Sequence, residues 1–566
     1  MKRASTSPSP PPSAQPAWLL PALLLILAAS AYLGIKSLDN TPFWDDEATV
    51  GIQSRNFLST GTLTAWDGRN LVAYANGILL DPNLETIDAP LQYWMTAASF
   101  KLLGISTWSA RFPFVLAGLL SLGVFWLLLR HEFKNQPMLR LYALAALALS
   151  LVFILNIRQC RYYAPTLLFS LLTFFCYRRA LANRRLMEFI FLGVAAALLF
   201  YSQFLLAACF LLAMGLAHLA LHRKDFTARD WAKLAFSVGI FLLLTLPYVF
   251  NHPIWVRQEA PVDEPWYWRK PMLLWWNFRE LNTMNALPWP LAFLAGWMLW
   301  KHRKDINLVR PALAWAIVSA GFLAFLALLS FQAIKRTEMA YIRYFIPAVP
   351  FLAGLIGVAL WYVHRKAPTL AVGILAVFLC TNLLSFAQPK FQFRWLLPAY
   401  VKEIHQPFPT PYSVTLEFLK NNATQDDHVL AVPFYCNYPL MFYLGDKIRI
   451  SGLLDRGTTL PVDRLEKLSP SLFMDSAFPH WLIAFSTTTD AEELLTYFQR
   501  EREVNGRVER YSYELVTNLN VCWFDTSRPE LPWHTFGPEK NFDPNRESVY
   551  VLKRVDAPKT SEQTAR

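Results

Sequence analysis

Residues 18–48 read WLLPALLLILAASAYLGIKSLDNTPFWDDEA. Positions 18–35 are apolar almost throughout, close to the roughly 20 residues that a helix needs to cross a bilayer. A polar segment follows and ends in three consecutive carboxylates, Asp45, Asp46 and Glu47. A cleaved signal peptide is the alternative, because AASA at 28–31 offers small residues for cleavage. Since more apolar runs follow, we predict an anchored transmembrane helix whose outer end leads into an acidic segment.

The composition is typical of a multi-spanning membrane protein. Of the 566 residues, 54% are hydrophobic and 17% are charged, whereas about 25% charged residues is usual for soluble domains. These figures exclude a plain soluble enzyme and a disordered chain. We predict about eleven spans, at about 18–35, 112–130, 140–156, 164–180, 187–200, 204–221, 232–250, 285–300, 311–331, 343–362 and 368–387.

The basic residues predict the orientation of these spans. The Ser/Pro-rich tail 1–17 is expected to be disordered and cytoplasmic, and every inner loop then carries Lys or Arg, as at 130–140 and 178–185. This agrees with the positive-inside rule. The net charge of +12 is then mostly a signal of topology, so nucleic acid is not expected as a partner. The first loop (36–111), the loop at 251–284 and the chain after about 388 would lie outside the cytoplasm.

The segment 391–566 alternates expected helices and strands, which is typical of a small α/β domain. We expect it to be extracytoplasmic, after a transmembrane domain over 18–390. Cys436 and Cys522 could pair there, or both could be small core residues. Helices are expected at 411–423, 461–468 and 491–506, strands at 428–434, 446–450, 481–485, 521–524 and 548–555, and either structure at 437–445.

Several short motifs lie on the predicted outer side. They are WDDEA at 44–48, APLQYW at 89–94, LLGISTWSARFP at 102–113, RQCRYYA at 158–164 and RYFIPAVP at 343–350. In this order and spacing they resemble the PMT/aminoarabinose-transferase-like glycosyltransferases, over about residues 15–390. That family belongs to the GT-C superfamily of membrane enzymes that use polyprenyl-phosphate sugars. The resemblance implies a GT-C fold with about eleven transmembrane helices.

The residue types fit that chemistry independently. Glycosyl transfer needs a base for the acceptor hydroxyl, and a carboxylate can serve. A phosphate leaving group needs cations, and arginine binds phosphate through a planar fork. The cations at outer ends of predicted spans are Arg158, Arg161, Lys335, Arg336 and Arg343. Snorkelling to lipid headgroups is the alternative for these arginines, and capping of a helix N-terminus is the alternative for the acidic triplet.

The resemblance implies a role for each candidate. Asp46 would be the catalytic base, with Glu47 orienting the acceptor or a divalent cation. The donor phosphate would be bound by Arg158, Arg161 and Arg343, with Lys335, Arg336 and Arg55 as further candidates. The remaining candidates for the substrate pocket are Asp45 (a fallback base), Tyr163, Gln203 and Asp88. No metal-ligand spacing is present, so no metal site is assigned.

The sequence therefore predicts an inner-membrane glycosyltransferase with an extracytoplasmic active site. Its partners would be a polyprenyl-phosphate-linked sugar and an acceptor such as lipid A, an envelope glycan or a protein. Asp88-Ala89-Pro90-Leu91 stands where aminoarabinose transferases have Lys-Pro-Pro-Leu, so the sugar is not predicted. A transporter or lipid flippase is the alternative, as is a non-catalytic member. Transporters, however, carry charge near the midplane of the bilayer, and the charges here lie at span ends.

Overall fold

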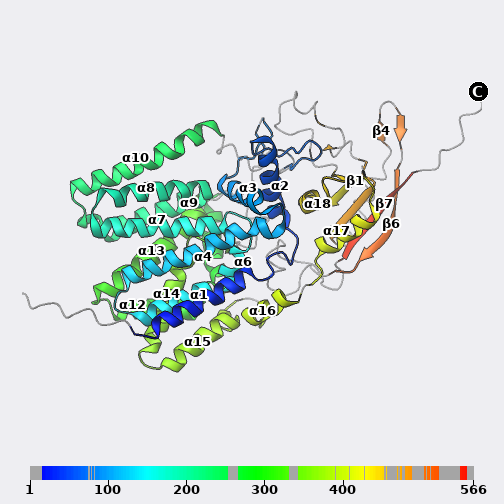
Figure 1. The fold of residues 1–566 in the computed structure, drawn as a ribbon. Coiled ribbons are helices and arrows are strands. Elements are labelled where there is room, and N and C mark those ends of the chain that lie inside the picture. Colours follow the sequence, from blue (N-terminus) through cyan, green and yellow to red (C-terminus); the bar gives the residue numbers. More distant parts are fainter. Residues whose placement is uncertain are drawn as a thin grey trace, which may run out of the picture.

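The computed structural model has a helical bundle at one end and a β-sheet at the other (Figure 1). It describes residues 16–73, 77, 80–81, 83–252, 266–329, 342–388, 391–406, 408–425, 427–450, 454, 468, 472–473, 478–486, 502–504, 507–509, 511–521 and 548–556.

The bundle contains a helix for each predicted apolar run. Its helices are α1 (Leu19–Ile35), α4 (Thr107–Glu132), α5 (Pro137–Ala148), α6 (Leu151–Ile157), α7 (Tyr163–Asn183), α8 (Leu186–Ser202), α9 (Phe204–Leu221), α10 (Ala228–Asn251), α12 (Trp289–Lys301), α13 (Ile306–Leu329), α14 (Val349–His364) and α15 (Pro368–Cys380). The run at 140–156 is broken, because α5 and α6 meet at a bend of 52°.

Length and composition identify several of these helices as membrane spans. Among the described residues, four helices are long and apolar enough to cross a bilayer, or five if the bent α5–α6 pair forms one span. Four shorter helices are also apolar, namely α1, α8, α14 and α15. A multi-spanning helical fold is therefore confirmed, while the number eleven stays a prediction.

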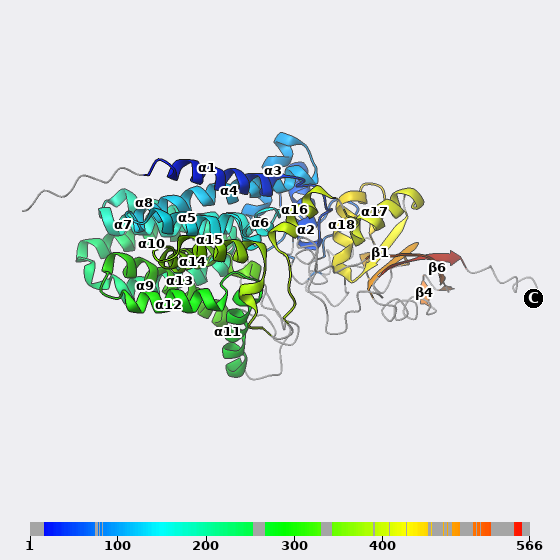
Figure 2. The same cartoon turned by 90° about the horizontal axis from the view of Figure 1, so that it is seen from below.

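Two helices outside the predicted spans complete the helical part. Residues 266–276, which the sequence suggested were part of an outer loop, belong to α11 (Trp266–Thr283), which projects from the bundle in Figure 2. A second unpredicted helix, α16 (Leu397–His405), packs on α1, where the Tyr400 hydroxyl donates to the Leu33 carbonyl at 2.8 Å. Both helices carry too many polar residues to form a continuous apolar run, and this explains why the sequence did not predict them.

The helices α2 (Asp45–Thr60) and α3 (Leu91–Leu103) lie between the bundle and the sheet (Figure 1). The acidic triplet forms the first turn of α2, where negative charge is favoured by the helix dipole. The residue at the N-cap is Trp44, whose side chain makes no capping hydrogen bond. Gly61, with φ +79°, ends the helix in the left-handed conformation that glycine adopts readily.

The C-terminal sheet has the strand order β2-β1-β3-β7-β6. Its strands are β1 (His428–Val432), β2 (Arg449–Ile450), β3 (Trp481–Ser486), β6 (Tyr511–Leu519) and β7 (Ser548–Asp556). β1 is parallel to β2 and β3, while β7 is antiparallel to β3 and β6. The helices α17 (Pro411–Asn422) and α18 (Asn437–Leu444) precede and follow β1, so the stretch at 437–445, left open from sequence, is a helix over nearly its whole length.

Part of the C-terminal prediction is wrong. The helix expected at 491–506 cannot continue to its end, because β4 (Arg502–Val504) pairs there with β5 (Arg507–Glu509). The edge strand β6 was not predicted, and its largely exposed, polar residues explain why. The predicted elements at 461–468 and 521–524 lie almost entirely outside the described residues. Cys436 is a buried free thiol, whereas Cys522 lies outside the described residues.

The sheet region is tied firmly to α2 through α18. The Phe442 ring lies so close to Gly51 that a Cβ on the glycine would approach it to 2.9 Å, and only glycine fits this crossing. The Asn70 side chain adds two buried hydrogen bonds, to the Gly445 carbonyl at 3.1 Å and from the Ile450 amide at 2.8 Å. The helix that carries the acidic triplet and the loop after it are therefore both fixed to the sheet region.

Candidate active site

Asp46 meets two arginines at the end of the bundle that faces the sheet. Its Oδ2 lies 3.3 Å from an Arg161 nitrogen and 3.2 Å from an Arg343 nitrogen. The Asp46 side chain is 26% exposed, and both arginines are largely buried. One aspartate from α2 is thus joined to the turn before α7 and to η4 (Ile342–Phe345), which precedes α14. An acid and two cations share one partly open site.

Aromatic rings hold the two guanidinium groups in place. Arg161 stacks over Tyr162 at 5.3 Å, and Arg343 lies over Trp44 at 5.5 Å and Tyr344 at 5.2 Å. The turn that carries Arg161 is itself anchored, because the Tyr162 amide donates to the Gln92 side chain of α3 at 3.1 Å. Stacking keeps a guanidinium in one plane and leaves its edge available for an anion.

Glu47 has a different environment from Asp46. Its side chain is fully buried, and it accepts hydrogen bonds from Arg111 at 2.9 and 2.6 Å and from the Cys160 amide at 2.9 Å. Arg111 also donates to the carbonyls of Leu38 and Thr41. The expectation that Glu47 faces an acceptor or a cation is therefore corrected: it links α2 to α4 and to the turn before α7.

Arg158, which was predicted to bind the donor phosphate, lies among backbone carbonyls. Its guanidinium is buried and donates to the carbonyls of Leu33, Gly34, Lys36 and Ser37 at 2.8–3.4 Å. These carbonyls lie at the end of α1, where the last backbone acceptors of a helix need partners. Arg158 therefore caps the C-terminus of α1 and does not join Asp46.

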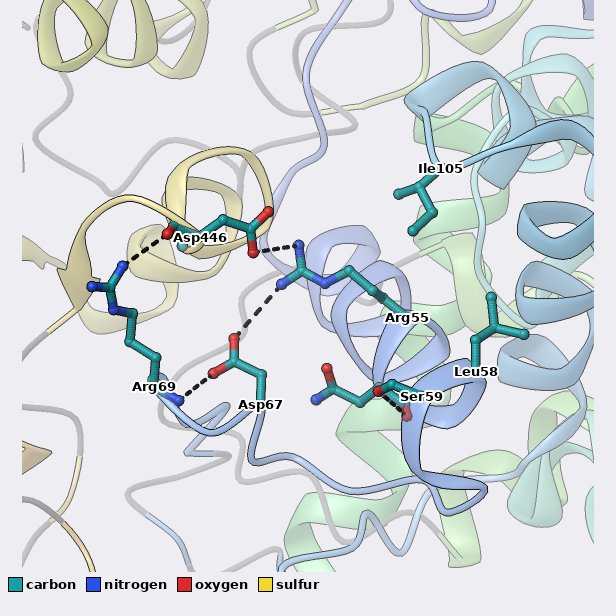
Figure 3. Close-up of a pocket in the computed structure, with 9 residues that line it drawn as sticks. Arg55, Leu58, Ser59, Asp67, Arg69, Ile105 and Asp446 are labelled. Carbon is teal, nitrogen blue, oxygen red and sulfur yellow. Dashed lines mark hydrogen bonds and ion pairs between the residues drawn. The ribbon is translucent and has the colours of Figure 1, made fainter. Parts of the chain in front are cut away.

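Arg55 lies on the opposite side of α2. It is nine residues beyond Asp46, and nine residues of α-helix rotate by about 900°, which is two and a half turns. Arg55 lies 3.6 Å from Asp67 and 3.7 Å from Asp446. These residues line an open pocket of about 590 Å³ with Leu58, Ser59, Arg69 and Ile105 (Figure 3). The predicted contact of Arg55 with the donor phosphate is thus not supported.

Asp45 is buried beside Asp46. Burial, followed by the neighbouring Asp46 charge, raises the pKa of the Asp45 carboxyl well above its ordinary value of 3.8. The group is therefore biased towards its neutral form. Asp45 is 5% exposed, so it is less accessible to an acceptor hydroxyl than the partly exposed Asp46.

The remaining candidates are divided between the site and other positions. Tyr163 is buried and close enough to Asp46, Arg161 and Arg343 to interact with them electrostatically. Asp88 is within electrostatic reach of Arg161 and accepts a hydrogen bond from the Tyr93 hydroxyl at 3.3 Å. Gln203 caps α9 by accepting from the amides of Leu205 and Leu206. Lys335 and Arg336 lie outside the described residues.

Two features of the site were missed from the sequence. Arg111 stands in the quoted motif at 102–113, yet only the fold reveals it as the partner of Glu47. Trp44 contacts Arg343 from the residue before α2. Within the described ranges, no group of three or more His, Cys, Asp or Glu side chains could hold a metal ion.

Comparisons with known proteins agree on the fold. The family model for dolichyl-phosphate-mannose-protein mannosyltransferases matches residues 88–250. ArnT from Cupriavidus metallidurans in the apo state is 16% identical, with 87% of this chain and 97% of that chain covered and a TM-score of 0.55. The same protein bound to undecaprenyl phosphate is 15% identical, with 95% and 98% covered and a TM-score of 0.58. No curated protein sequence matches the chain.

These two kinds of similarity concern overlapping parts of the molecule. The structural likeness extends over nearly the whole chain and establishes the fold. The family match spans α3 to α10, which includes Arg111 and the turn that carries Arg161. The chain is therefore a multi-pass membrane protein that shares the fold of ArnT, and its residues 88–250 are similar to the dolichyl-phosphate-mannose-protein mannosyltransferases.

Proposed function

We propose that this enzyme transfers a sugar from a polyprenyl-phosphate donor to an extracytoplasmic acceptor, with Asp46 as the general base. The observation that carries the proposal is the contact of Asp46 with Arg161 and Arg343. These three residues come from three separate segments of the chain. An acid for a hydroxyl and two cations for a phosphate are the groups that this reaction needs.

The roles follow from the charges that develop during transfer. The acceptor oxygen attacks the anomeric carbon and gives its proton to Asp46. The bond between that carbon and the phosphate oxygen breaks, and its electron pair stays on the phosphate. Arg161 and Arg343 stabilise the resulting negative charge. Both ion pairs use Oδ2 of Asp46, so Oδ1 remains for the acceptor hydroxyl.

The donor is proposed from structural similarity together with the two arginines. One of the similar structures is that of ArnT bound to undecaprenyl phosphate. A lipid-linked phosphate would enter from the bilayer beside the helices and place its charge near the guanidinium groups. The acceptor would be a lipid, a glycan or a protein on the extracytoplasmic side, and the positive-inside pattern supports that orientation.

We also infer a division of the chain into two functional parts. The catalytic part would comprise the bundle together with α2 and α3. It corresponds to the domain that the sequence predicts over residues 18–390. Because α16 packs on α1, the separate C-terminal unit would begin closer to α17. That unit would help to select the acceptor, since it lies beside α2 (Figure 1).

The test is sugar transfer by the purified full-length enzyme in detergent. Undecaprenyl phosphates carrying radiolabelled glucose, mannose, galactose or 4-amino-4-deoxyarabinose would be supplied with an envelope extract as the acceptor source. Label should enter a lipid, glycan or protein fraction with the wild type and not with Asp46→Asn. No label from any donor, together with movement of the lipid between leaflets of reconstituted vesicles, would contradict the proposal and favour a flippase.

A further inference from the structure

Gln53 on α2 is a fully buried amide without partners. Its exposed fraction is 0%, and neither its Oε1 nor its Nε2 has a hydrogen-bond partner among the residues that the structure describes. Burying an amide without hydrogen bonds costs about 1–3 kcal/mol or more. Most buried polar groups in native proteins are paired, so this one needs an explanation.

The position of Gln53 on the helix relates it to the active site. It lies seven residues beyond Asp46, and seven residues rotate by about 700°, only about 20° short of two full turns. Gln53 and Asp46 therefore lie on the same face of α2, about 10 Å apart along the helix axis. The opposite face carries Gly51 against Phe442 and Arg55 against Asp446, so Gln53 points away from the sheet.

Three other polar side chains of α2 and α3 have hydrogen-bond partners. The Ser54 hydroxyl donates to the Tyr93 carbonyl at 3.1 Å, and the Asn56 amide donates to the Thr64 carbonyl at 2.9 Å. On α3, the Gln92 side chain accepts from the Tyr162 amide. These paired side chains contrast with Gln53, whose two polar atoms both lack partners.

A second unpaired group lies next to the catalytic cluster. The Tyr163 hydroxyl is buried and has no hydrogen-bond partner in the described part of the chain. It is close enough to Asp46, Arg161 and Arg343 to interact with their charges. Two buried polar side chains with unused hydrogen-bonding capacity thus lie along the Asp46 face, one beside the carboxylate and one two helical turns farther.

We propose that Gln53 binds hydroxyls of the substrate sugar that lie away from the reacting carbon, and that Tyr163 binds hydroxyls closer to that carbon. The proposal rests on the proposed glycosyltransferase function and extends it to a residue that binds the sugar. An amide presents two donors and two acceptors, which suits a polyhydroxylated, uncharged group better than a phosphate. The hydroxyls belong either to the donor sugar or to a glycan acceptor, and the kinetics distinguish the two.

Two glutamine-to-methionine variants test the role without a change of side-chain length. In Gln53→Met, an unpaired polar group is replaced by an apolar one of similar shape. We expect the melting temperature of the ligand-free enzyme to stay the same or rise. Gln92→Met is the matched control. It removes the partner of the Tyr162 amide, so its melting temperature should fall.

Sugar transfer supplies the second measurement. We expect Gln53→Met to lower kcat/KM by about 10- to 100-fold, because a site built to bind a hydroxyl loses a specific contact. A rise in the KM of the donor would assign the hydroxyls to the donor sugar. A rise in the KM of the acceptor would assign them to the acceptor.

A melting temperature lowered as in Gln92→Met, or unchanged kinetics in an active enzyme, would overturn the inference. Failure of the proposed function gives a different result, namely a wild type that transfers no sugar. Even then the melting temperatures of the two variants decide whether Gln53 is a structural glutamine.

Discussion

The end of the bundle that faces the sheet contains two pairs of arginines with different surroundings. Arg111 and Arg158 are buried and donate to Glu47 or to backbone carbonyls of the α1–α2 connection. Arg161 and Arg343 meet a single carboxyl oxygen of Asp46, which is partly exposed. The first pair binds groups of the protein interior, while the second pair lies at a partly exposed carboxylate, where we propose that it binds a substrate anion.

This difference separates stability from function at one membrane surface. A buried guanidinium that donates to several protein acceptors cannot turn to a ligand without leaving those groups unpaired. A stacked guanidinium that shares one carboxylate with a second arginine can bind a phosphate at little cost. The number and kind of acceptors around an arginine therefore predict its role better than its place at the end of a span.

The largest expected effect is a loss of protein stability when an arginine of the first pair, Arg111, is replaced. Arg111→Met leaves the fully buried Glu47 carboxylate without its counter-ion, which should cost about 3–5 kcal/mol. Thermal unfolding in detergent would show a large fall in melting temperature, or expression would fail. The double variant Arg111→Met/Glu47→Gln should recover part of the loss. Wild-type stability of the single variant would remove the distinction between the two pairs.

A smaller loss of stability is expected at Arg158. Arg158→Met removes the donors to the four carbonyls at the end of α1, and unpaired buried acceptors cost about 1–3 kcal/mol. The melting temperature should fall, whereas the KM of the donor lipid should stay the same in the fraction that remains folded. A raised donor KM without a lower melting temperature would return Arg158 to the phosphate site.

The second pair should show the converse behaviour. Arg161→Ala and Arg343→Ala each remove one cation from the proposed phosphate site, and we expect the KM of the donor to rise about 10- to 100-fold. Melting temperatures should change little, because Asp46 can still be solvated. The matched comparison is Arg158→Met under the same conditions. Unchanged donor KM values in both variants would contradict the phosphate role.

The smallest expected effect is the contribution of the Asp45 carboxyl to the pH dependence of the unfolding free energy. Burial and the Asp46 charge raise its pKa in the folded state, so the folded protein binds more protons than the unfolded chain. The unfolding free energy should therefore fall as the pH rises from about 4 through the raised pKa. In Asp45→Asn this contribution disappears, and melting temperatures between pH 5 and 9 should vary less than in the wild type. Parallel profiles would indicate that Asp45 is not buried as described.

Much of the fold could be predicted because spans are long apolar segments. The helices α9 and α10 begin and end within a few residues of the predicted runs. The helices α4 and α13 end close to the predicted positions but begin earlier than predicted. The strand β6 could not be predicted, because an exposed edge strand needs no apolar pattern. Helix α16 is short, and the contact of Tyr400 with α1 favours it only after the fold has formed.

The site could be predicted only in part, for a similar reason. Residue type and position suggested Asp46, Arg161 and Arg343, which lie together. The same reasoning suggested Arg158 and Glu47, whose partners are distant backbone carbonyls and Arg111. Which neighbour in the acidic triplet is buried depends on the rotation of α2, and Phe442 of α18 helps to set that rotation through contacts far away in sequence.

The most direct test of Asp46 as the base is a comparison of Asp46→Asn with Asp45→Asn. Both variants remove one carboxylate from adjacent positions, and initial rates of sugar transfer would be measured at pH 7 in the same detergent. We expect Asp46→Asn to lower kcat by about 100- to 10,000-fold and Asp45→Asn to change it only a few-fold, with both proteins folded. Near-full transfer by Asp46→Asn, or a larger loss in Asp45→Asn, would contradict the assignment of Asp46.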